Sequence, residues 1–322
     1  MTGQLLLSIA IPNFNYERYL FRCLASAVKQ EGDDIEILVA DNCSTDDSWR
    51  VIEAIEDRRI RVWRHSRNIG LYPNWNFLLR QARGRYFKLL QSDDWLEPDF
   101  IRSVRRLIAS VSDENIIALL LGYRISYERD PTDLHMSDSD IPSTTLPSIF
   151  SPGSDFDAAL RSLNYSMPTL NVINTELARR LGGYKPETSM RADSILFAGL
   201  LGLKPSWLVV SCDTVVAVTR VHRANDRGKY SRFSAFFDEI LILNAMSSMA
   251  RDTSDCQKLQ LLKSRAAGQA LISLPIDLAR RKNLAEFWMH FRQLCEERLL
   301  WLACTMLPRE AWRTAIKRSL FV

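Results

Sequence analysis

Lys88-Leu89-Leu90-Gln91-Ser92-Asp93-Asp94-Trp95 is the stretch that decides the fold, because an apolar strand runs directly into two adjacent carboxylates. Two acids at the end of a buried strand repel each other and lose hydration unless a cation lies beside them. Hard divalent cations prefer carboxylate oxygens, and ligands of open α/β sheets gather beyond the carboxyl ends of the strands. The pattern therefore indicates a site for a metal ion and phosphate groups. Ser-Asp-Asp is also common in turns and helix caps, so the stretch alone leaves both interpretations open.

Apolar runs alternate with helical patterns around this stretch. Strands buried on both faces are predicted at residues 5–11, 35–40, 60–63, 85–90 and 116–125. Apolar residues recur at helical spacing in 20–28, 49–55, 75–82 and 100–111, and Ser44 and Asp47 resemble a capping box for the second of these helices. This alternation, without hairpin signals, predicts an α/β fold with a mostly parallel, doubly wound sheet.

The rhythm changes after residue 128. Residues 129–153 contain four prolines and predict a long surface loop. Strands follow at 170–174 and at 207–218, the latter with a break near Cys212-Asp213, and the pattern is helical from Phe233 to the end. We therefore expect a domain over 1–225 and a C-terminal helical region over 226–322.

Composition narrows the class of protein. The chain has 322 residues, a net charge of +4 and 47% hydrophobic residues, which is ordinary for a globular protein and does not indicate nucleic acid as a partner. Six scattered cysteines without a C-x-x-C pair predict reduced thiols in a cytosolic protein without a zinc site. No apolar run reaches about 18 residues, and no signal peptide is expected at the N-terminus.

The residues after Pro308 carry an amphipathic pattern. After Pro308, basic residues form one helical stripe and apolar residues another: Arg309, Arg313 and Lys317, against Trp312, Ile316 and Leu320. The pattern fits a helix on the surface of an anionic membrane, a helix packed on the main domain, or a contact in a homo-oligomer. The segment 299–307 is too short to span a bilayer.

Four polar clusters follow predicted strand ends, and parallel topology places them on one rim. They are Pro12-Asn13-Phe14-Asn15, Asp41-Asn42-Cys43-Ser44-Thr45-Asp46, Arg67-Asn68-Ile69-Gly70 and Ser92-Asp93-Asp94. In this order they resemble motifs of the family 2 glycosyltransferases, which are inverting enzymes with the GT-A fold. The family patterns Pro-x-Tyr-Asn, Val-Asp-Asp-Gly-Ser-Thr-Asp, Asn-x-Gly and Asp-x-Asp-Asp correspond to the four clusters. Gly182-Gly183-Tyr184 followed by Asp193, and then Arg220-Val221-His222, resemble later motifs, so the resemblance covers about residues 5–225.

The resemblance implies a site for a nucleotide-sugar donor. It assigns nucleotide contacts to Pro12, Asn13, Asn15, Asp41, Asn68, Ser92 and Asp93. It assigns Asp94 as the direct ligand of Mg²⁺ or Mn²⁺. It assigns Asp93 to a contact with the ribose or to the second coordination shell of the metal, and His222 to a third metal ligand or a contact with the diphosphate. Gln91 stands where many relatives have an acid. The alternatives are a turn acid at Asp41, a residue stabilising its own turn at Asn68, and a solvated loop histidine at His222.

The resemblance also implies a single-displacement mechanism with Asp193 as general base, because the metal replaces the acid on the leaving-group side. Ala192 replaces the first acid of the Glu-Asp pair of relatives, and the alternative role of Asp193 is an N-cap for a helix over 194–203. Asp46 and Asp47 are predicted as caps. Contacts to the sugar or acceptor are predicted for Trp95, Tyr184 and Arg191, although the two aromatic rings are equally compatible with the core.

We therefore expect a metal-dependent inverting glycosyltransferase that uses a nucleoside-diphosphate sugar and a glycan or lipid-linked glycan acceptor. A cytoplasmic location, peripheral on the membrane, follows from the same interpretation. The alternative is a degenerate sugar-nucleotide-binding subunit that partners an active transferase, since Gln91 and Ala192 depart from the family pattern. A nucleotidyltransferase is disfavoured because the loop after the first strand is not glycine-rich, and a dehydrogenase is excluded by the absence of G-x-G-x-x-G.

Overall fold

The computed structural model describes residues 5–111, 115–127, 137–140, 146–185, 191–221, 232–250 and 252–281. The chain divides into two compact units. The first comprises Met1–Pro186 and Leu203–Asn225, and the second comprises Glu187–Gly202 and Asp226–Val322. The segment 187–202 thus belongs with the C-terminal helical region.

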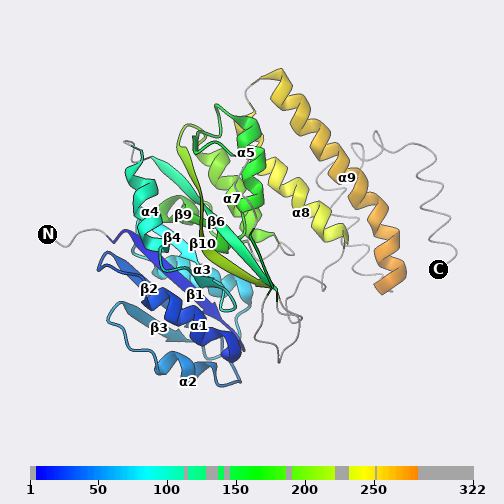
Figure 1. Ribbon diagram of the computed structural model, residues 1–322. Coiled ribbons are helices and arrows are strands. Elements are labelled where there is room, and N and C mark those ends of the chain that lie inside the picture. Colours follow the sequence, from blue (N-terminus) through cyan, green and yellow to red (C-terminus); the bar gives the residue numbers. More distant parts are fainter. Residues whose placement is uncertain are drawn as a thin grey trace. The chain divides into compact units, whose positions relative to one another are not determined.

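The first unit is built on one sheet, with strand order β3-β2-β1-β4-β9-β6-β10-β5 in the described residues (Figure 1). The strands are β1 (Leu7–Asn13), β2 (Ile35–Asp41), β3 (Ile60–Arg64), β4 (Tyr86–Leu89), β5 (Trp95–Leu96), β6 (Ile116–Tyr127), β7 (Ser137–Asp140), β8 (Ile149–Phe150), β9 (Asn171–Asn174) and β10 (Leu208–Val221). Strand β1 pairs in parallel with both β2 and β4, and β2 with β3. The carboxyl ends of these four strands therefore lie along one rim of the sheet.

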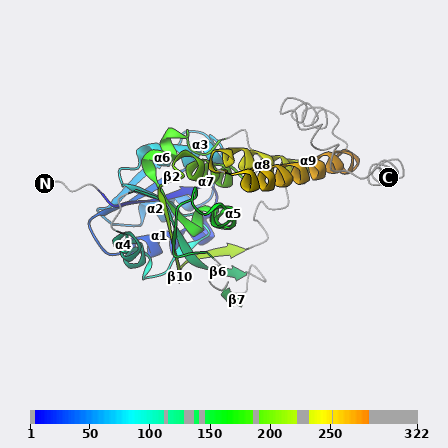
Figure 2. The ribbon, with the colours of Figure 1, turned by 90° about the horizontal axis from the view of Figure 1, so that it is seen from above.

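Helices cover both faces of this sheet. Those of the first unit are α1 (Glu17–Val28), α2 (Ser48–Glu53), α3 (Leu71–Gln81), α4 (Phe100–Ala109), α5 (Phe156–Ser162) and α6 (Thr175–Arg180). Figure 2 shows α3 and α6 on one side of the sheet and α1 and α4 on the other. Leu24 of α1 and Phe100 of α4 join Ile9 of β1 and Ile37 of β2 in one hydrophobic core. Burial on both faces explains why β1 and β2 are continuous apolar runs.

A glycine brings β4 close to β1. A Cβ on Gly84 would lie 2.5 Å from the backbone N of Ser8, so only glycine allows this approach. The acid pair follows β4 directly, so this contact helps to fix where the pair emerges at the rim.

The predicted α/β class is confirmed, and so is the break in β10, whose register against β6 shifts between Ser211 and Val215. The sheet is mostly parallel, as predicted, and β9 is an antiparallel strand within it, paired with both β4 and β6. One expectation, the long loop over 129–153, is wrong. The segment 129–153 is not a continuous loop, because β7 pairs with β6 and β8 with β10. Strands β6 and β10 span 12 and 14 residues, and β7 and β8 pair with backbone groups of these long strands.

The second unit is helical in its described residues. It contains α7 (Ala192–Leu203), α8 (Arg232–Ala245) and α9 (Thr253–Arg281), and α8 packs against α9. The last residue of α7, Leu203, is counted with the first unit. None of the helices in the described ranges is long and apolar enough to cross a bilayer. The amphipathic segment predicted after Pro308 lies outside the described residues.

Candidate functional site

The parallel register brings three of the four polar clusters directly together. Asn13 at the end of β1 lies opposite Asp41 at the end of β2, and Asn42 N donates to Asn13 O at 2.8 Å. On the other side of β1, Ser92 Oγ donates to the carbonyl of Pro12 at 2.6 Å. The expectation that these clusters share one rim is therefore confirmed.

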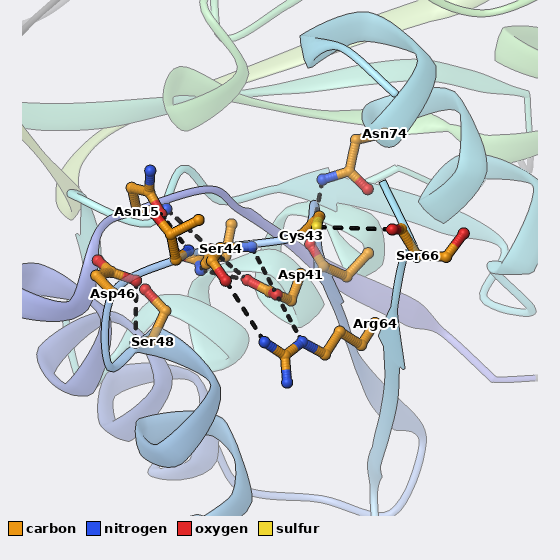
Figure 3. A network of polar contacts seen from close by, with 12 residues as sticks. Asn15, Asp41, Cys43, Ser44, Asp46, Ser48, Arg64, Ser66 and Asn74 are labelled. Atoms are coloured by element: carbon orange, nitrogen blue, oxygen red, sulfur yellow. Dashed lines mark hydrogen bonds and ion pairs between the residues drawn. The ribbon is translucent and has the colours of Figure 1, made fainter. Parts of the chain in front are cut away.

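Asp41 is the centre of a polar network that ties β1 to the loop after β2 (Figure 3). Its carboxylate is fully buried and accepts hydrogen bonds from Asn13 Nδ2 (2.9 Å), from Ser44 Oγ, and from Ser44 N (3.1 Å). Arg64 Nε lies 3.6 Å from Asp41 Oδ2, the oxygen that also accepts from Ser44 N. These are the contacts of a turn acid that braces the loop, while its predicted contact with a nucleotide base stays a prediction.

The side-chain amide of Asn13 has a defined orientation. A carboxylate only accepts hydrogen bonds, so the amide nitrogen faces Asp41 and the amide oxygen points away from it. Asn13 Oδ1 is buried and has no hydrogen-bond partner within the described part of the chain. Phe14 follows it and is 39% exposed at the same rim. A buried acceptor without a donor indicates a place for a polar group that the chain itself does not supply.

Two residues of this rim have left-handed backbone. Asn15 has φ 57° and Cys43 has φ 64°. Asn15 is held there by its amide N, which donates to Ser44 Oγ (2.9 Å), and by its Oδ1, which accepts from Thr45 N (2.8 Å). Asparagine tolerates this conformation, whereas cysteine adopts it at a cost.

Asp46, and not Asp47, accepts the side-chain hydrogen bond at the start of α2. Asp46 accepts from Ser48 N (3.1 Å) and from Glu17 N (3.0 Å), so its predicted role at a helix start is confirmed at α1 and α2 together. The expected capping box of Ser44 and Asp47 is wrong, because the Ser44 hydroxyl bonds to Asp41 and Asp47 makes no side-chain cap bond.

The Asn68 turn is linked to this rim through Asn42. Asn42 Nδ2 donates to Asn68 Oδ1 (2.9 Å) and to Gly70 O (3.2 Å), and Asn42 Oδ1 accepts from Ile69 N (2.9 Å). Asn68 Oδ1 also accepts from Gly70 N at 2.8 Å, so Asn68 does stabilise its own turn. Gly70 has φ 93° and is the N-cap of α3.

The two acids after β4 differ in their surroundings. Asp94 is 1% exposed, and each of its carboxylate oxygens accepts a hydrogen bond, one from Thr169 Oγ1 and one from Arg220 N (2.8 Å). Burial, together with the charge of Asp93, raises the pKa of Asp94 to about 7. Asp93 is 8% exposed, and its backbone carbonyl accepts from Arg220 Nε at 3.1 Å.

Two cations beside this pair were not assigned roles from the sequence. Lys88 is fully buried on β4, and its ammonium donates to the carbonyls of Pro168 (2.9 Å), Thr169 and Asn171 (3.2 Å). Burial lowers the pKa of Lys88 to about 7, and the charge of Asp94 opposes this change. The signal was present in the sequence as a lone charge inside the apolar run 86–90. The second cation, Arg220, lies at the end of β10 and appeared only as part of a motif.

The two predicted aromatic contacts are both buried. Trp95 is 7% exposed, with the guanidinium carbons of Arg22 and Arg220 at 3.4 and 5.2 Å from the centre of its ring. Tyr184 is 3% exposed, and its ring packs edge-on against Trp75 with ring centres 5.1 Å apart. These contacts favour the core alternative for both rings, and their contact with a sugar stays a prediction.

Asp193 and Arg191 lie in the second unit. Asp193 is in the first turn of α7, which begins one residue earlier, so it is not the N-cap of a helix over 194–203. Its Oδ1 accepts from Ser194 N at 2.7 Å, and Arg191 N donates to Asp238 of α8 at 3.3 Å. Burial raises the pKa of Asp193 to about 6, against the opposing effects of the Ser194 N–H and the Arg191 charge.

The predicted metal set is only partly described. His222 lies outside the described residues. Among the residues that the structure describes, no three His, Cys, Asp or Glu side chains are grouped as a metal site. The carboxylates of Asp93 and Asp94 are hard oxygen donors of the kind that Mg²⁺ and Mn²⁺ prefer.

Comparison with known proteins gives the class of this chain. Residues 8–166 match the family model "Glycosyl transferase family 2", so this region of the chain is similar to the family 2 glycosyltransferases. Chondroitin synthase of Escherichia coli is 38% identical over 97 residues, which is 30% of this chain and 14% of that protein. UDP-Glc:alpha-D-GlcNAc-diphosphoundecaprenol beta-1,3-glucosyltransferase WfaP of Escherichia coli is 37% identical over 90 residues, covering 28% of this chain and 36% of WfaP. The chain thus matches well under half of the length of these relatives.

Solved structures share the GT-A fold. S. aureus TarS 1–349 in complex with UDP-GlcNAc superposes with a TM-score of 0.64 at 16% identity, covering 87% of this chain and 77% of the TarS 1–349 chain. The mannosyltransferase PcManGT of Pyrobaculum calidifontis in complex with GDP-Man and Mn²⁺ superposes with a TM-score of 0.55 at 16% identity, covering 94% of this chain and 87% of that structure. At this identity the likeness concerns the fold.

Proposed function

We propose that this chain transfers a sugar, with inversion, from a nucleoside-diphosphate sugar to a hydroxyl of a glycan or lipid-linked glycan. The observation that carries the proposal is the pair Asp93 and Asp94 at the end of β4, beside the joined ends of β1 and β2, in a region similar to the family 2 glycosyltransferases. TarS and PcManGT bind UDP-GlcNAc and GDP-Man, and the name of WfaP gives a lipid-linked acceptor. A cytoplasmic location at the membrane surface is part of the same proposal.

The contacts of the rim support a division of roles. The buried acceptor Asn13 Oδ1 suits an N–H group on the edge of a nucleobase, and the exposed Phe14 ring lies beside it. Ser92 fixes the start of the acid turn against β1 through Pro12. Asn15 and Asp41 hold the loop that forms the other side of the base pocket.

We assign the metal contact to Asp93 and a positioning role to Asp94, which reverses the roles expected from the resemblance. Both carboxylate oxygens of Asp94 already accept hydrogen bonds from Thr169 and Arg220, whereas Asp93 is the more exposed acid of the pair. Mg²⁺ or Mn²⁺, when held by Asp93, would offset the negative charge that develops on the leaving diphosphate. The cationic side chain of Arg220 lies beside the same turn.

Asp193 is proposed as the general base. Its carboxylate takes the proton of the acceptor hydroxyl while that oxygen forms the bond to the anomeric carbon. The bond from this carbon to the phosphate oxygen breaks, and its electron pair leaves with the nucleoside diphosphate. A pKa of about 6 suits this role, because the carboxylate is mostly ionised near neutral pH and is more basic than an ordinary aspartate.

The test is thermal-shift binding of UDP, dTDP, GDP and CDP, each with and without Mn²⁺. We expect one nucleotide to raise the melting temperature in a metal-dependent way, because a ligand that binds only the folded state stabilises it. Asp93→Asn should abolish the shift. Asp33→Asn is the matched control, because it removes the same charge at an exposed ion pair with Arg58, before β2. If no nucleotide shifts the wild type, the proposed function is wrong.

Transfer is tested separately with the donor identified in this way. Asp193→Asn should bind the nucleotide as the wild type does but release no nucleoside diphosphate in the presence of acceptor. Nucleotide binding by the wild type without any transfer would instead favour the degenerate binding subunit.

A further inference from the structure

Lys88 is a buried cation whose three N–H groups are all used by the fold. It lies on β4 and is 0% exposed, and the centre of the Phe100 ring lies 5.8 Å from its Nζ. A buried ammonium is costly unless its donors are satisfied. Here three carbonyl oxygens, those of Pro168, Thr169 and Asn171, match the three donors.

The three carbonyls belong to one short segment. Pro168–Leu170 is a 3₁₀ turn, and Asn171 is the first residue of β9. Strand β9 pairs with β4 only at Tyr86 and Phe87, so the pairing stops one residue before Lys88. Lys88 therefore continues the link between β4 and this segment where the strand pairing ends.

The same segment reaches the acid pair through a side chain. Thr169 is 0% exposed, and its hydroxyl donates to Asp94 Oδ2. The path from Lys88 to Asp94 thus runs through one carbonyl and one hydroxyl of Thr169. The other oxygen of Asp94 accepts the backbone N–H of Arg220, so the orientation of this carboxylate depends on both contacts.

We propose that Lys88 is a positioning residue for the donor site. By holding the 3₁₀ turn 168–170, it places the Thr169 hydroxyl on Asp94, and Asp94 in turn fixes the Ser92–Asp94 turn that presents Asp93. A merely apolar side chain at position 88 would fill the core but leave three carbonyls without donors. If Lys88 is replaced, metal-dependent nucleotide binding should become weaker, and this consequence rests on the proposed function.

The test uses Lys88→Met, which keeps the length and apolar stem of the side chain, and Thr169→Val, which breaks the link without touching the charge. Val172→Ala is the matched control, because Val172 is a fully buried core residue of β9 next to the same segment. The Mn²⁺ concentration that half-saturates binding of the nucleoside diphosphate is measured by calorimetry. We expect it to rise about 10- to 100-fold in Lys88→Met and Thr169→Val, and to stay unchanged in Val172→Ala and Thr169→Ser.

A second readout needs no ligand. Hydrogen exchange of the Arg220 amide reports directly on Asp94, because this N–H donates to Asp94 Oδ1. We expect faster exchange at Arg220 in Lys88→Met and Thr169→Val than in Val172→Ala. Wild-type exchange rates at Arg220 in both variants would overturn the positioning role. If the wild type binds no nucleotide while exchange at Arg220 still responds, the proposed function fails and the structural link stands.

Discussion

Asp193→Asn should stabilise this protein at neutral pH while removing its proposed chemistry. Burial raises the pKa of Asp193 to about 6, whereas an unfolded aspartate titrates near 4. A carboxyl group whose pKa is higher in the folded state favours folding when it is protonated. This contribution is complete below about pH 4 and is lost as the pH rises through about 6.

The magnitude follows from the two pKa values. A difference of about two units corresponds to about 3 kcal/mol of unfolding free energy, lost by the wild type between about pH 4 and about pH 7. Asparagine is neutral throughout and its amide oxygen still accepts from Ser194 N, so the variant keeps the bond without burying a charge. The difference between variant and wild type should therefore be small at acid pH and should reach about 2–3 kcal/mol in favour of the variant above about pH 7.

Urea unfolding at about pH 4.5, 6 and 8 measures this difference. Asp252→Asn is the control, because it removes an exposed carboxylate in the same unit at the start of α9, where asparagine caps equally well. The control should show no pH-dependent gain. A stability difference for Asp193→Asn that is the same at all three pH values would refute the reasoning, because it would show that the carboxylate is not destabilised by its surroundings.

Two further predictions concern the rim. Cys43→Gly should raise the free energy of unfolding by about 0.5–1 kcal/mol, because glycine adopts φ 64° without the steric cost of a Cβ atom. Cys43→Ala keeps the Cβ atom and should bring no gain. Equal melting temperatures for the two variants would contradict this prediction. Asn42→Asp introduces the aspartate of the family pattern Val-Asp-Asp-Gly-Ser-Thr-Asp, yet it should lower the free energy of unfolding by about 1–3 kcal/mol. The reason is that a carboxylate cannot donate to Asn68 Oδ1 and Gly70 O. An unchanged urea midpoint would contradict the stabilising role of these two hydrogen bonds.

The first half of the fold could be predicted because each strand is a self-contained signal. The apolar runs before Asn13, Asp41 and the acid pair are buried on both faces, and this burial leaves a local pattern in the sequence. The short strands β5, β7 and β8 leave no such pattern. They exist because the long strands β6 and β10 offer backbone partners, which is a tertiary effect.

The candidate site could be located but not resolved into roles. The position of the polar clusters follows from parallel topology, and the register of Asn13 against Asp41 confirms it. The amide orientation of Asn13, the burial of Tyr184 and the ring contacts of Trp95 depend on packing partners far away in the sequence. Composition and spacing contain no information on them.

The clearest case is the difference between Asp93 and Asp94, which are neighbours of the same residue type. Asp94 turns inward because donors exist there, and these come from Thr169 and Arg220, which lie 75 and 126 positions further along the chain. Its neighbour Asp93 is the more exposed acid of the pair, at the rim where we propose that a cation and a diphosphate bind. The orientation of Asp94 is therefore set by residues far along the chain, and a change at Thr169 or Lys88 should alter metal binding without any change in the acids themselves.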